Sequence, residues 1–397
     1  MSIYIYTSIA LNYFPKARVL STTLKKFHPD WKFCMLVSED VDEQTRATML
    51  SYDDIDEVIS YDQLIITDGF ATKLNDVEFK QWCFKHAIVE FCTAVKGSAL
   101  KFLLNKPDCE AAFYFDPDIA IFDDLTQLTD HFKNGKSILL TPHLTDIEKT
   151  YDAVWDNEIS ILRHGIYNLG FIGVKNDANG HKLAQWWKDR LDMYCYADIP
   201  NGVFTDQSWC DMVPAVFDGV HVLRLPQYNV STWNLNHRFV DGKDLDSLFV
   251  NKDFKLCFYH FSGFDSGAQL AMLNKYAQGM PKLFLLRDWY IAECQRLDNP
   301  EFSQRKWQFN YYSDGEKILN EHRIVYRQRS DLQQYFSDPF DVSNRSLAKW
   351  FEFEYPKEQT NNFKAELLKK EHELNEVLNS TSWKITQPLR KIMQMFK

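Results

Sequence analysis

The opening of the chain constrains its fold more than any other segment. Residues 2–8 alternate as a short strand does, residues 14–27 follow a helical pattern, and residues 32–37 form a second apolar strand. A strand, a helix and a strand in this order predict a right-handed crossover between parallel strands. Ligands bind such sheets at the carboxyl ends of the strands, where Thr7 and Ser8 stand. The sequence therefore predicts an α/β fold with a mostly parallel central sheet.

The alternation of strands and helices continues to about residue 285. Further strands are predicted at residues 111–122, 137–140, 167–174, 220–225 and 256–261. Residues 77–106 predict two helices broken near Gly97, and residues 181–194 predict an amphipathic helix. These elements extend the same layered arrangement along the chain.

The chain has 397 residues, which is more than one hydrophobic core usually serves. We expect a catalytic domain at residues 1–285, an extension at residues 286–356 and a helical tail at residues 357–397. Within the tail, a thin apolar seam predicts a short coiled coil, and through it an oligomer. The seam consists of Phe363, Leu367, Leu374 and Leu378.

The last residues of the tail form a basic amphipathic pattern after Pro388. Their apolar positions follow helical spacing and are Leu389, Ile392, Met393 and Phe396. Two alternatives stay open for this segment. It lies on anionic lipid at the inner face of the cell membrane, or it docks on the protein's own body.

Composition excludes some classes of function. The formal net charge is −10, whereas nucleic-acid binding requires clustered Lys and Arg, so no nucleic-acid partner is expected. The eight cysteines show no Cys-x-x-Cys pair and no spacing typical of zinc, which predicts reduced and mostly buried thiols. There is no basic region followed by an apolar run at the N-terminus, and no apolar stretch is long enough to cross a bilayer. The sequence therefore predicts a cytoplasmic protein.

The strongest candidate site is Asp116-Pro117-Asp118, which interrupts the apolar run of residues 111–122. Two carboxylates at the end of a buried strand are costly unless a cation or a ligand compensates them. A hard divalent cation takes oxygen ligands from such a pair and also accepts diphosphate oxygens. We therefore predict that Asp116 and Asp118 bind Mn²⁺ or Mg²⁺. The alternative is a loop that ends in two solvated acids.

The context of this motif resembles the family of glycogenin and the lipopolysaccharide galactosyltransferases, which are retaining sugar transferases with the GT-A fold. In that family an Asp-x-Asp after an apolar strand holds manganese, and Asp116 and Asp118 match it. The family's His-x-x-Gly, whose His completes the metal site, is similar to the segment from His260 to Gly263. The resemblance covers roughly residues 1–285. It implies a Rossmann-like GT-A domain that binds a UDP-sugar, with Gly263 beside the donor.

Three more segments carry the resemblance in the family's order. The family's Asn-x-Gly strand is similar to Asn168-Leu169-Gly170-Phe171, and its Asp-Gln pair, which faces the transferred sugar, to Asp206-Gln207. A basic residue upstream of the metal motif touches the donor in the family, and Lys101 looks like it. The resemblance thus implies that Asp206 and Gln207 are catalytic and that Asn168, Gly170 and Lys101 contact the donor.

The chain departs from the family in one motif, because the Lys-Pro-Trp that follows His-x-x-Gly is absent. Residues 380–390, Ser-Thr-Ser-Trp-Lys-Ile-Thr-Gln-Pro-Leu-Arg, are similar to tails of bacterial surface-polysaccharide glycosyltransferases. This second resemblance implies a lipid-linked glycan, such as O-antigen or capsule, as the acceptor.

The chemistry also follows without the family. Breaking a sugar–diphosphate bond leaves negative charge on the departing phosphate, which a metal and a cationic side chain stabilise. Asp116, Asp118 and His260 would hold the metal. An inverting enzyme needs a base for the acceptor hydroxyl, whereas front-face substitution uses the leaving phosphate, and we expect retention. The alternatives are a structural role for His260 and a helix-capping role for Asp206.

Several other residues are candidates for substrate contacts. Tyr6 and Thr7, at the end of the first strand, are expected to meet the nucleotide base. His143 follows a strand and is expected to line the donor or acceptor pocket. Asn229, Trp233 and Asn234 combine amides with an aromatic face, which suits a hydroxyl-rich substrate.

We therefore predict a metal-dependent hexosyltransferase that moves a hexose from a UDP-sugar to a glycan. A sugar nucleotidyltransferase would show a Gly-rich phosphate loop near the first strand, and residues 7–15 contain no glycine. An aspartyl-phosphate phosphatase would place its Asp-x-Asp on the first strand with a Thr soon after, which this chain does not. An inactive scaffold that binds glycans remains the alternative outside enzymes.

Overall fold

The computed structural model describes residues 2–380, 382, 383 and 386. The chain divides into two compact units, Met1–Asn310 and Tyr311–Lys397. The first unit contains a central seven-stranded sheet flanked by helices. The predicted α/β fold with a mostly parallel central sheet is therefore confirmed.

The central sheet has the strand order β10-β6-β7-β4-β1-β2-β3. Its strands are β1 (Ser2–Ile9), β2 (Lys32–Val37), β3 (Glu57–Ser60), β4 (Cys109–Phe115), β6 (Ile138–Pro142), β7 (Tyr167–Lys175) and β10 (Val220–Val222). Neighbouring strands are parallel except at β7, which is antiparallel to both β4 and β6. Most strands are nearly continuous apolar runs because helices cover the sheet.

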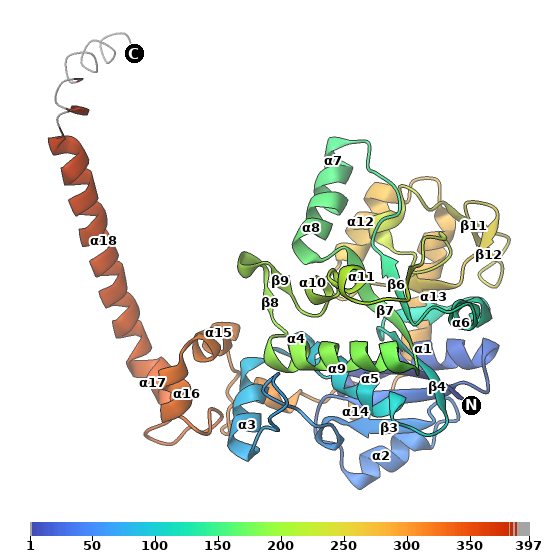
Figure 1. Cartoon of the computed structure of the whole chain (residues 1–397), viewed down its shortest axis with the longest axis horizontal. Coiled ribbons are helices and arrows are strands. Elements are labelled where there is room, and N and C mark those ends of the chain that lie inside the picture. Colours follow the sequence, from blue (N-terminus) through green and yellow to red (C-terminus); the bar gives the residue numbers. More distant parts are fainter. Residues whose placement is uncertain (1, 381, 384–385, 387–397) are drawn as a thin grey trace. The chain divides into compact units, whose positions relative to one another are not determined.

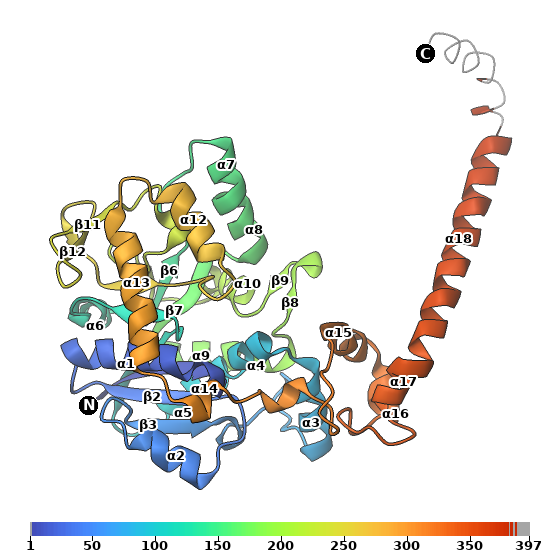
Figure 2. The ribbon, with the colours of Figure 1, turned by 180° about the vertical axis from the view of Figure 1, so that it is seen from behind.

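Helices cover both faces of this sheet. Helix α1 (Phe14–Phe27) lies on one face, and α5 (Lys96–Leu104) and α9 (Ala178–Met193) lie together on the other (Figures 1 and 2). The predicted strand, helix and strand at the start of the chain are confirmed as β1, α1 and β2. The main core lies between β1, β2, β4 and α1. Ile5, Phe33 and Phe113 belong to it and are fully buried.

The apolar run of residues 111–122 forms two strands rather than the single strand that we predicted. After β4 the chain turns at Asp116-Pro117-Asp118 and continues as β5 (Ile119–Ile121). Pro117 has no backbone N–H to donate, so the ladder breaks at this point. Strand β5 leaves the central sheet and pairs with β14 (Phe258–His260) in an antiparallel ladder.

Residues 77–106 form three helices rather than the two that we predicted, although one of the breaks, at Val95, does lie near Gly97. They are α3 (Asp76–Lys85), α4 (Ile88–Ala94) and α5. Gly97 lies inside the first turn of α5. A Cβ at this position would meet Cα of Lys188 at 2.7 Å, so Gly97 allows α5 and α9 to pack closely instead of ending a helix.

The remaining elements of the first unit surround the sheet. The helices are α2 (Glu43–Leu50), α6 (Thr126–Lys133), α7 (Tyr151–Ala153), α8 (Ser160–His164), α10 (Gln207–Cys210), α11 (Val213–Val216), α12 (Ala268–Tyr276), α13 (Pro281–Arg296) and α14 (Pro300–Ser303). A π-helical stretch, Val154–Ile159, joins α7 to α8. The short strands are β8 (Ala197–Asp198), β9 (Val203–Phe204), β11 (Val240–Gly242), β12 (Leu248–Val250) and β13 (Phe254–Lys255).

The second unit is helical and contains α15 (Asn320–Gln328), α16 (Ser330–Tyr335), α17 (Leu347–Phe353) and α18 (Tyr355–Asn379). The predicted helix at residues 357–379 is confirmed as part of α18, and its seam residues Phe363, Leu367 and Leu374 are exposed. The predicted amphipathic segment with Leu389, Ile392, Met393 and Phe396 lies outside the described residues. No helix in the described part of the chain combines the length and apolarity needed to cross a membrane.

Candidate functional site

Several predicted site residues meet at one edge of the central sheet. Asp116 follows the carboxyl end of β4, and His143 follows the carboxyl end of β6. Because β7 runs in the opposite direction, its first residues, Asn168 and Gly170, lie at the same edge. The backbone N–H of Asp116 donates to the carbonyl of Gly170 over 2.8 Å. The single antiparallel strand thus brings Asn168 and Gly170 to the acidic motif.

Asp116, Asp118 and His260 form a compact cluster, which we call the metal triad. One potential ligand atom from each of the three lies within 4.8 Å of those of the other two. Nε2 of His260 is 3.1 Å from Oδ1 of Asp118 and 3.8 Å from Oδ2 of Asp116. The pairing of β14 with β5 produces this geometry, because it sets His260 opposite Ile119, next to Asp118.

The imidazole of His260 is held by two amides on its other side. Its Nδ1 lies 3.2 Å from Oδ1 of Asn168 and 3.3 Å from Oδ1 of Asn229. These oxygens accept, so Nδ1 carries the hydrogen and Nε2 presents its lone pair to the carboxylates. Three acceptors therefore face one point, and they suit a hard divalent cation with oxygen and nitrogen ligands.

The carboxylates of the triad favour positive charge beside them, on the imidazole itself or on a cation. Burial opposes a charged imidazole, but Asp118 and Asp116 outweigh it and raise the pKa of His260. Burial likewise opposes the Asp118 carboxylate, but His260 outweighs it and lowers the pKa of Asp118. The site is thus built to hold positive charge between its members.

The position of His260 requires a glycine at residue 170. A Cβ at residue 170 would lie 2.5 Å from Cε1 and 2.7 Å from Nδ1 of His260, which real Cβ atoms do not tolerate. Gly170 therefore supports the triad by leaving room for the imidazole. The sequence predicted a different role for it, a contact with the donor.

Lys96 is the main residue that the sequence analysis missed. Its Nζ donates to Oδ2 of Asp206 at 3.1 Å and to Oδ1 of Asp116 at 3.3 Å, and it lies 4.1 Å from the ring centre of Tyr114. Burial opposes the ammonium charge, but Asp116 and Asp206 outweigh it and raise the pKa of Lys96. Lys96 therefore places a fixed positive charge beside the metal triad.

Lys101 was the predicted donor contact, and the structure does not bring it to the triad. Its Nζ donates to the side-chain oxygen of Gln185 on α9. Residues five apart in a helix differ by about 140° around its axis, so Lys96 and Lys101 point in different directions. Lys96 is 5% exposed and faces the site, whereas Lys101 faces the neighbouring helix.

Asp206 and Gln207 lie in the wall of the same site. Asp206 is 2% exposed, and it makes no side-chain capping bond to α10, so the capping alternative has no bond to support it. Thr205 precedes it with a φ of +47°, a left-handed conformation that is strained for a β-branched residue. The amide oxygen of Gln207 accepts from the backbone of Leu169 at 3.2 Å, which ties this wall to β7.

A cavity of about 750 Å³ opens over these residues. The predicted site residues that line it are Asp116, Asp118, His143, Asn168, Asp206, Gln207, Trp233, His260 and Gly263. Lys96, Asp156, Asn157, Ser160 and His164 line it as well. We call it the larger cavity.

A second cavity of about 450 Å³, the smaller cavity, adjoins the first, and both are lined by Lys96, Asp116 and Asp118. Its other walls come from Ser8 at the end of β1, from Tyr13 in the 3₁₀ turn after that strand, and from α4. The triad and Lys96 therefore stand where two cavities meet.

The other predicted contacts lie behind the cavity walls. Thr7 and Tyr6 are buried in β1, where the hydroxyl of Tyr6 donates to the carbonyl of Lys96 at 3.3 Å. Asn229 is buried and donates to Asn168 at 2.9 Å, and Asn234 donates to the carbonyl of Asn229 at 3.0 Å. Their observed contacts position the residues that line the cavity.

His143 is in the wall of the larger cavity and is kept neutral. Burial lowers its pKa to about 4. Its Nδ1 donates to the carbonyl of Ile166 at 3.2 Å, and its Nε2 accepts from the amide of Asn168 at 3.2 Å. His143 thereby fixes the orientation of the amide that holds His260.

No protein-family model matches the chain. The chain is 29% identical over 178 residues to the uncharacterized protein YfnF and 27% identical over 195 residues to the uncharacterized protein YfnD, both of Bacillus subtilis (strain 168). The matched segments cover 44% and 48% of this chain. They span only 57% and 59% of the length of those curated relatives.

Solved structures of glycosyltransferases are similar to the chain at low identity. The galactosyltransferase LgtC, in complex with donor and acceptor sugar analogues, is 13% identical, with a TM-score of 0.38 over 66% of this chain and 87% of that one. Mouse xyloside xylosyltransferase 1 is also 13% identical, with a TM-score of 0.36 over 66% of this chain and 97% of that one.

Proposed function

We propose that this chain is a metal-dependent glycosyltransferase that moves a hexose from a UDP-sugar to a glycan acceptor. One observation carries the proposal: the metal triad and Lys96 meet between two adjoining cavities at the sheet edge where α/β proteins bind ligands. A site that joins a divalent cation to a fixed ammonium suits a diphosphate. The cavities on its two sides leave room for a nucleoside and for sugars.

Asp116, Asp118 and His260 would hold Mn²⁺ or Mg²⁺. When bound, such a cation supplies positive charge to the diphosphate of the donor and to the leaving group. Lys96 adds a second positive charge that is preorganised by its two carboxylate partners, so it needs no rearrangement as negative charge develops. Lys96 takes over the role that the sequence analysis gave to Lys101.

The smaller cavity suits the nucleoside, because it lies at the end of β1 and includes the aromatic ring of Tyr13. The larger cavity suits the transferred hexose and the acceptor. Its polar lining includes Asp206, Gln207 and His143, which can hydrogen-bond sugar hydroxyls, and Trp233 offers an aromatic face.

The engagement of the acidic side chains supports retention of the anomeric configuration. Among the described residues, four carboxylates line the larger cavity: Asp116, Asp118, Asp156 and Asp206. The first two belong to the triad, Asp206 is bound by Lys96, and Asp156 accepts from Lys275 at 2.5 Å and Tyr276 at 2.7 Å. An inverting reaction needs a base for the acceptor hydroxyl, and each of these four carboxylates already has a partner, whereas front-face substitution uses the leaving phosphate itself.

The acceptor is proposed to be a lipid-linked glycan of a bacterial surface polysaccharide, on the resemblance of residues 380–390 to the tails of such enzymes. The proposal includes a place on the cytoplasmic face of the membrane and association of copies through α18. The exposed seam of that helix, with Phe363, Leu367 and Leu374, supports the association.

A panel of nucleotide sugars tests the proposal. The purified chain with Mn²⁺ should release UDP from at least one UDP-hexose, and Asp118→Ala should abolish the release. Asp123→Asn is the matched control, since Asp123 lies five residues further on and outside the triad. Equal hydrolysis by the parent and Asp118→Ala would overturn the catalytic assignment. An inactive scaffold would hydrolyse no donor and show no coupled heat in a titration of Mn²⁺ with UDP.

A further inference from the structure

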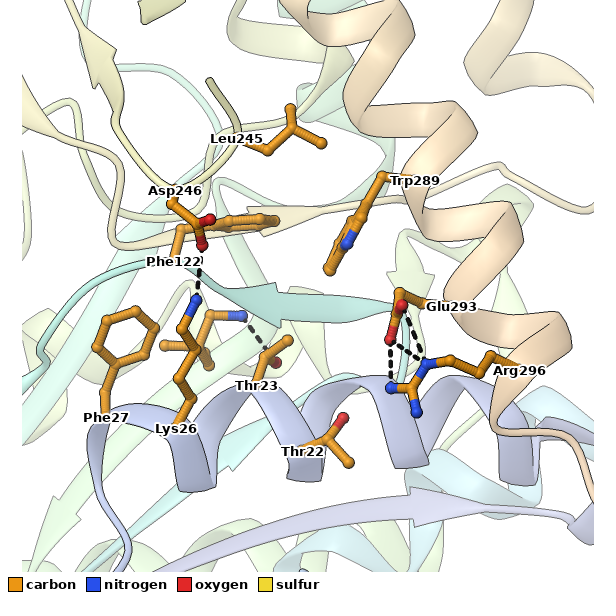
Figure 3. Close-up of a pocket in the computed structure, with 11 residues that line it drawn as sticks. Thr22, Thr23, Lys26, Phe27, Phe122, Leu245, Asp246, Trp289, Glu293 and Arg296 are labelled. Carbon is orange, nitrogen blue, oxygen red and sulfur yellow. Dashed lines mark hydrogen bonds and ion pairs between the residues drawn. The ribbon is translucent and has the colours of Figure 1, made fainter. Parts of the chain in front are cut away.

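A separate cavity of about 410 Å³ shares no lining residue with the larger or the smaller cavity. Figure 3 shows the residues that line it. We call it the aromatic groove. Its floor is α1, one wall is α13, and the remaining sides come from the end of β5 and from residues 245 and 246. Its size falls within the range of small-molecule sites, roughly 300–1,000 Å³.

Aromatic rings form much of the surface of the groove. Trp289 projects from α13 beside Phe122, with ring centres 5.3 Å apart in an edge-to-face arrangement, and Phe27 closes one end (Figure 3). All three rings are only partly buried, so each still offers surface to a ligand. The C–H faces of a sugar ring pack well on such rings, particularly on the large face of a Trp.

The charged residues of the groove neutralise one another. Nζ of Lys26 lies 2.6 Å from Oδ1 of Asp246 at one side. At the other side, Nη2 of Arg296 lies 2.6 Å from Oε2 of Glu293, and Nε of Arg296 donates to both oxygens at 3.1 Å (Figure 3). Two cations and two anions thus leave no net charge to attract an ionic ligand.

The same pairs still present hydrogen-bonding groups to a neutral ligand. A carboxylate accepts more bonds than one partner fills, and a guanidinium has five N–H donors. On the floor, the hydroxyl of Thr22 donates to the carbonyl of Arg18 at 2.6 Å, which leaves its oxygen lone pairs free to accept. Donors and acceptors around an aromatic platform match the hydroxyl groups of a hexose.

We infer that the aromatic groove is a second saccharide-binding site, which takes an uncharged hexose unit of a glycan and stacks it on Trp289. The inference depends only on the groove and holds whether or not the proposed transfer reaction is correct. The groove and the larger cavity have no lining residue in common, so substitutions can disturb one without removing a wall of the other.

Saturation-transfer NMR tests the inference on the full chain, with maltotriose, cellotriose and N,N′,N″-triacetylchitotriose as neutral probes. At least one probe should bind, and Trp289→Ala should weaken binding about tenfold, as the loss of one stacking contact predicts. Trp289→Phe should retain part of the affinity. Trp155→Ala, which removes an exposed Trp outside the groove, should leave binding unchanged.

Two further variants keep the test independent of the folding of Trp289→Ala. Arg296 is 60% exposed, so Arg296→Ala should fold and should weaken binding several-fold. Asp118→Asn, in the metal triad, should bind the same probe as well as the parent. Loss of binding in Asp118→Asn but not in Trp289→Ala would place the sugar in the larger cavity and overturn the inference.

The charge of the ligand is tested with the same material. Binding of a neutral probe should not change between low and high NaCl, because the attraction is not ionic. Absence of binding by every neutral trisaccharide, or preference for a trisaccharide of galacturonic acid with strong weakening by salt, would refute the proposed class of ligand.

Discussion

Gly170 faces the imidazole of His260 so closely that a methyl group does not fit between them, since a Cβ would lie 2.5 Å from Cε1. The consequence is a prediction for Gly170→Ala. His260 should be displaced from Asp118, and the affinity for Mn²⁺, measured by calorimetry, should fall about 10–100-fold, as is typical when groups that orient a metal ligand are disturbed.

Gly173→Ala on the same strand is the control for that variant. Its Cβ would meet the ring of Phe113 at 2.7 Å rather than the triad, because residues 170 and 173 lie on opposite faces of β7. This variant should lower stability and leave the affinity for Mn²⁺ near that of the parent. Equal loss of Mn²⁺ affinity in both variants would show that packing of β7, and not the room left for His260, determines binding.

Mn²⁺ should raise the melting temperature through the metal triad. A ligand that binds only the folded state stabilises it by about 2.7 kcal/mol at 100 times its Kd. Asp118→Asn removes a charged ligand and should lose the Mn²⁺-dependent increase, whereas Asp123→Asn should keep it. Scanning calorimetry with Mn²⁺ and with EDTA measures the difference. An undiminished increase in Asp118→Asn would locate the stabilising metal elsewhere.

Lys96 and Lys101 on α5 form a matched pair of substitutions. Lys96→Met removes the ammonium that binds Asp116 and Asp206, so kcat for donor hydrolysis should fall about 100-fold or more, as when one preorganised charge-stabilising group is lost. Lys101→Met breaks only the contact with Gln185 and should remain near the parent. Steady-state kinetics with saturating Mn²⁺ decide between them. A larger loss of kcat in Lys101→Met than in Lys96→Met would show that Lys101, and not Lys96, contacts the donor.

The sequence was sufficient to predict the sheet and the acidic motif because both follow from local patterns. Apolar strands around α1 set the parallel crossover, and two carboxylates after a buried strand are rare without a partner. The short distance between Asp116 and His260 could not be predicted from such local patterns. It depends on the pairing of β5 with β14, which are more than a hundred residues apart.

Lys96 was missed although helical periodicity contains a signal for it. Leu100 and Leu103 lie four and seven residues after it, and both are fully buried, so all three share one face of α5. Lys101 falls off that face. A lysine in register with buried leucines needs a charged partner, and identifying that partner required the fold.

The antiparallel direction of β7 was also beyond the sequence pattern. A buried strand with apolar residues on both faces reads the same in either direction. The direction matters for the site, because it brings the first residues of β7, and not the last, to the edge where Asp116 lies.

The buried pair of Lys188 and Asp192 on α9 leads to a prediction about stability. Nζ of Lys188 is 2.5 Å from Oδ2 of Asp192, and the two side chains are 5% and 0% exposed. Asp192 also accepts from the backbone N–H of Thr67 at 2.8 Å, which ties the chain after β3 to α9. Lys188→Met should leave a buried carboxylate unpaired and lower the free energy of unfolding by about 3–5 kcal/mol.

Urea unfolding followed by circular dichroism measures that loss, and two further variants serve as controls. Lys133→Met breaks an exposed pair with Asp130, and exposed pairs contribute only about 0–1 kcal/mol, so it should have little effect. Lys188→Met combined with Asp192→Asn should recover most of the stability, because a neutral amide still accepts from Thr67 without a buried charge. If the double variant is as unstable as Lys188→Met alone, packing of the lysine stem, and not the unpaired charge, accounts for the loss.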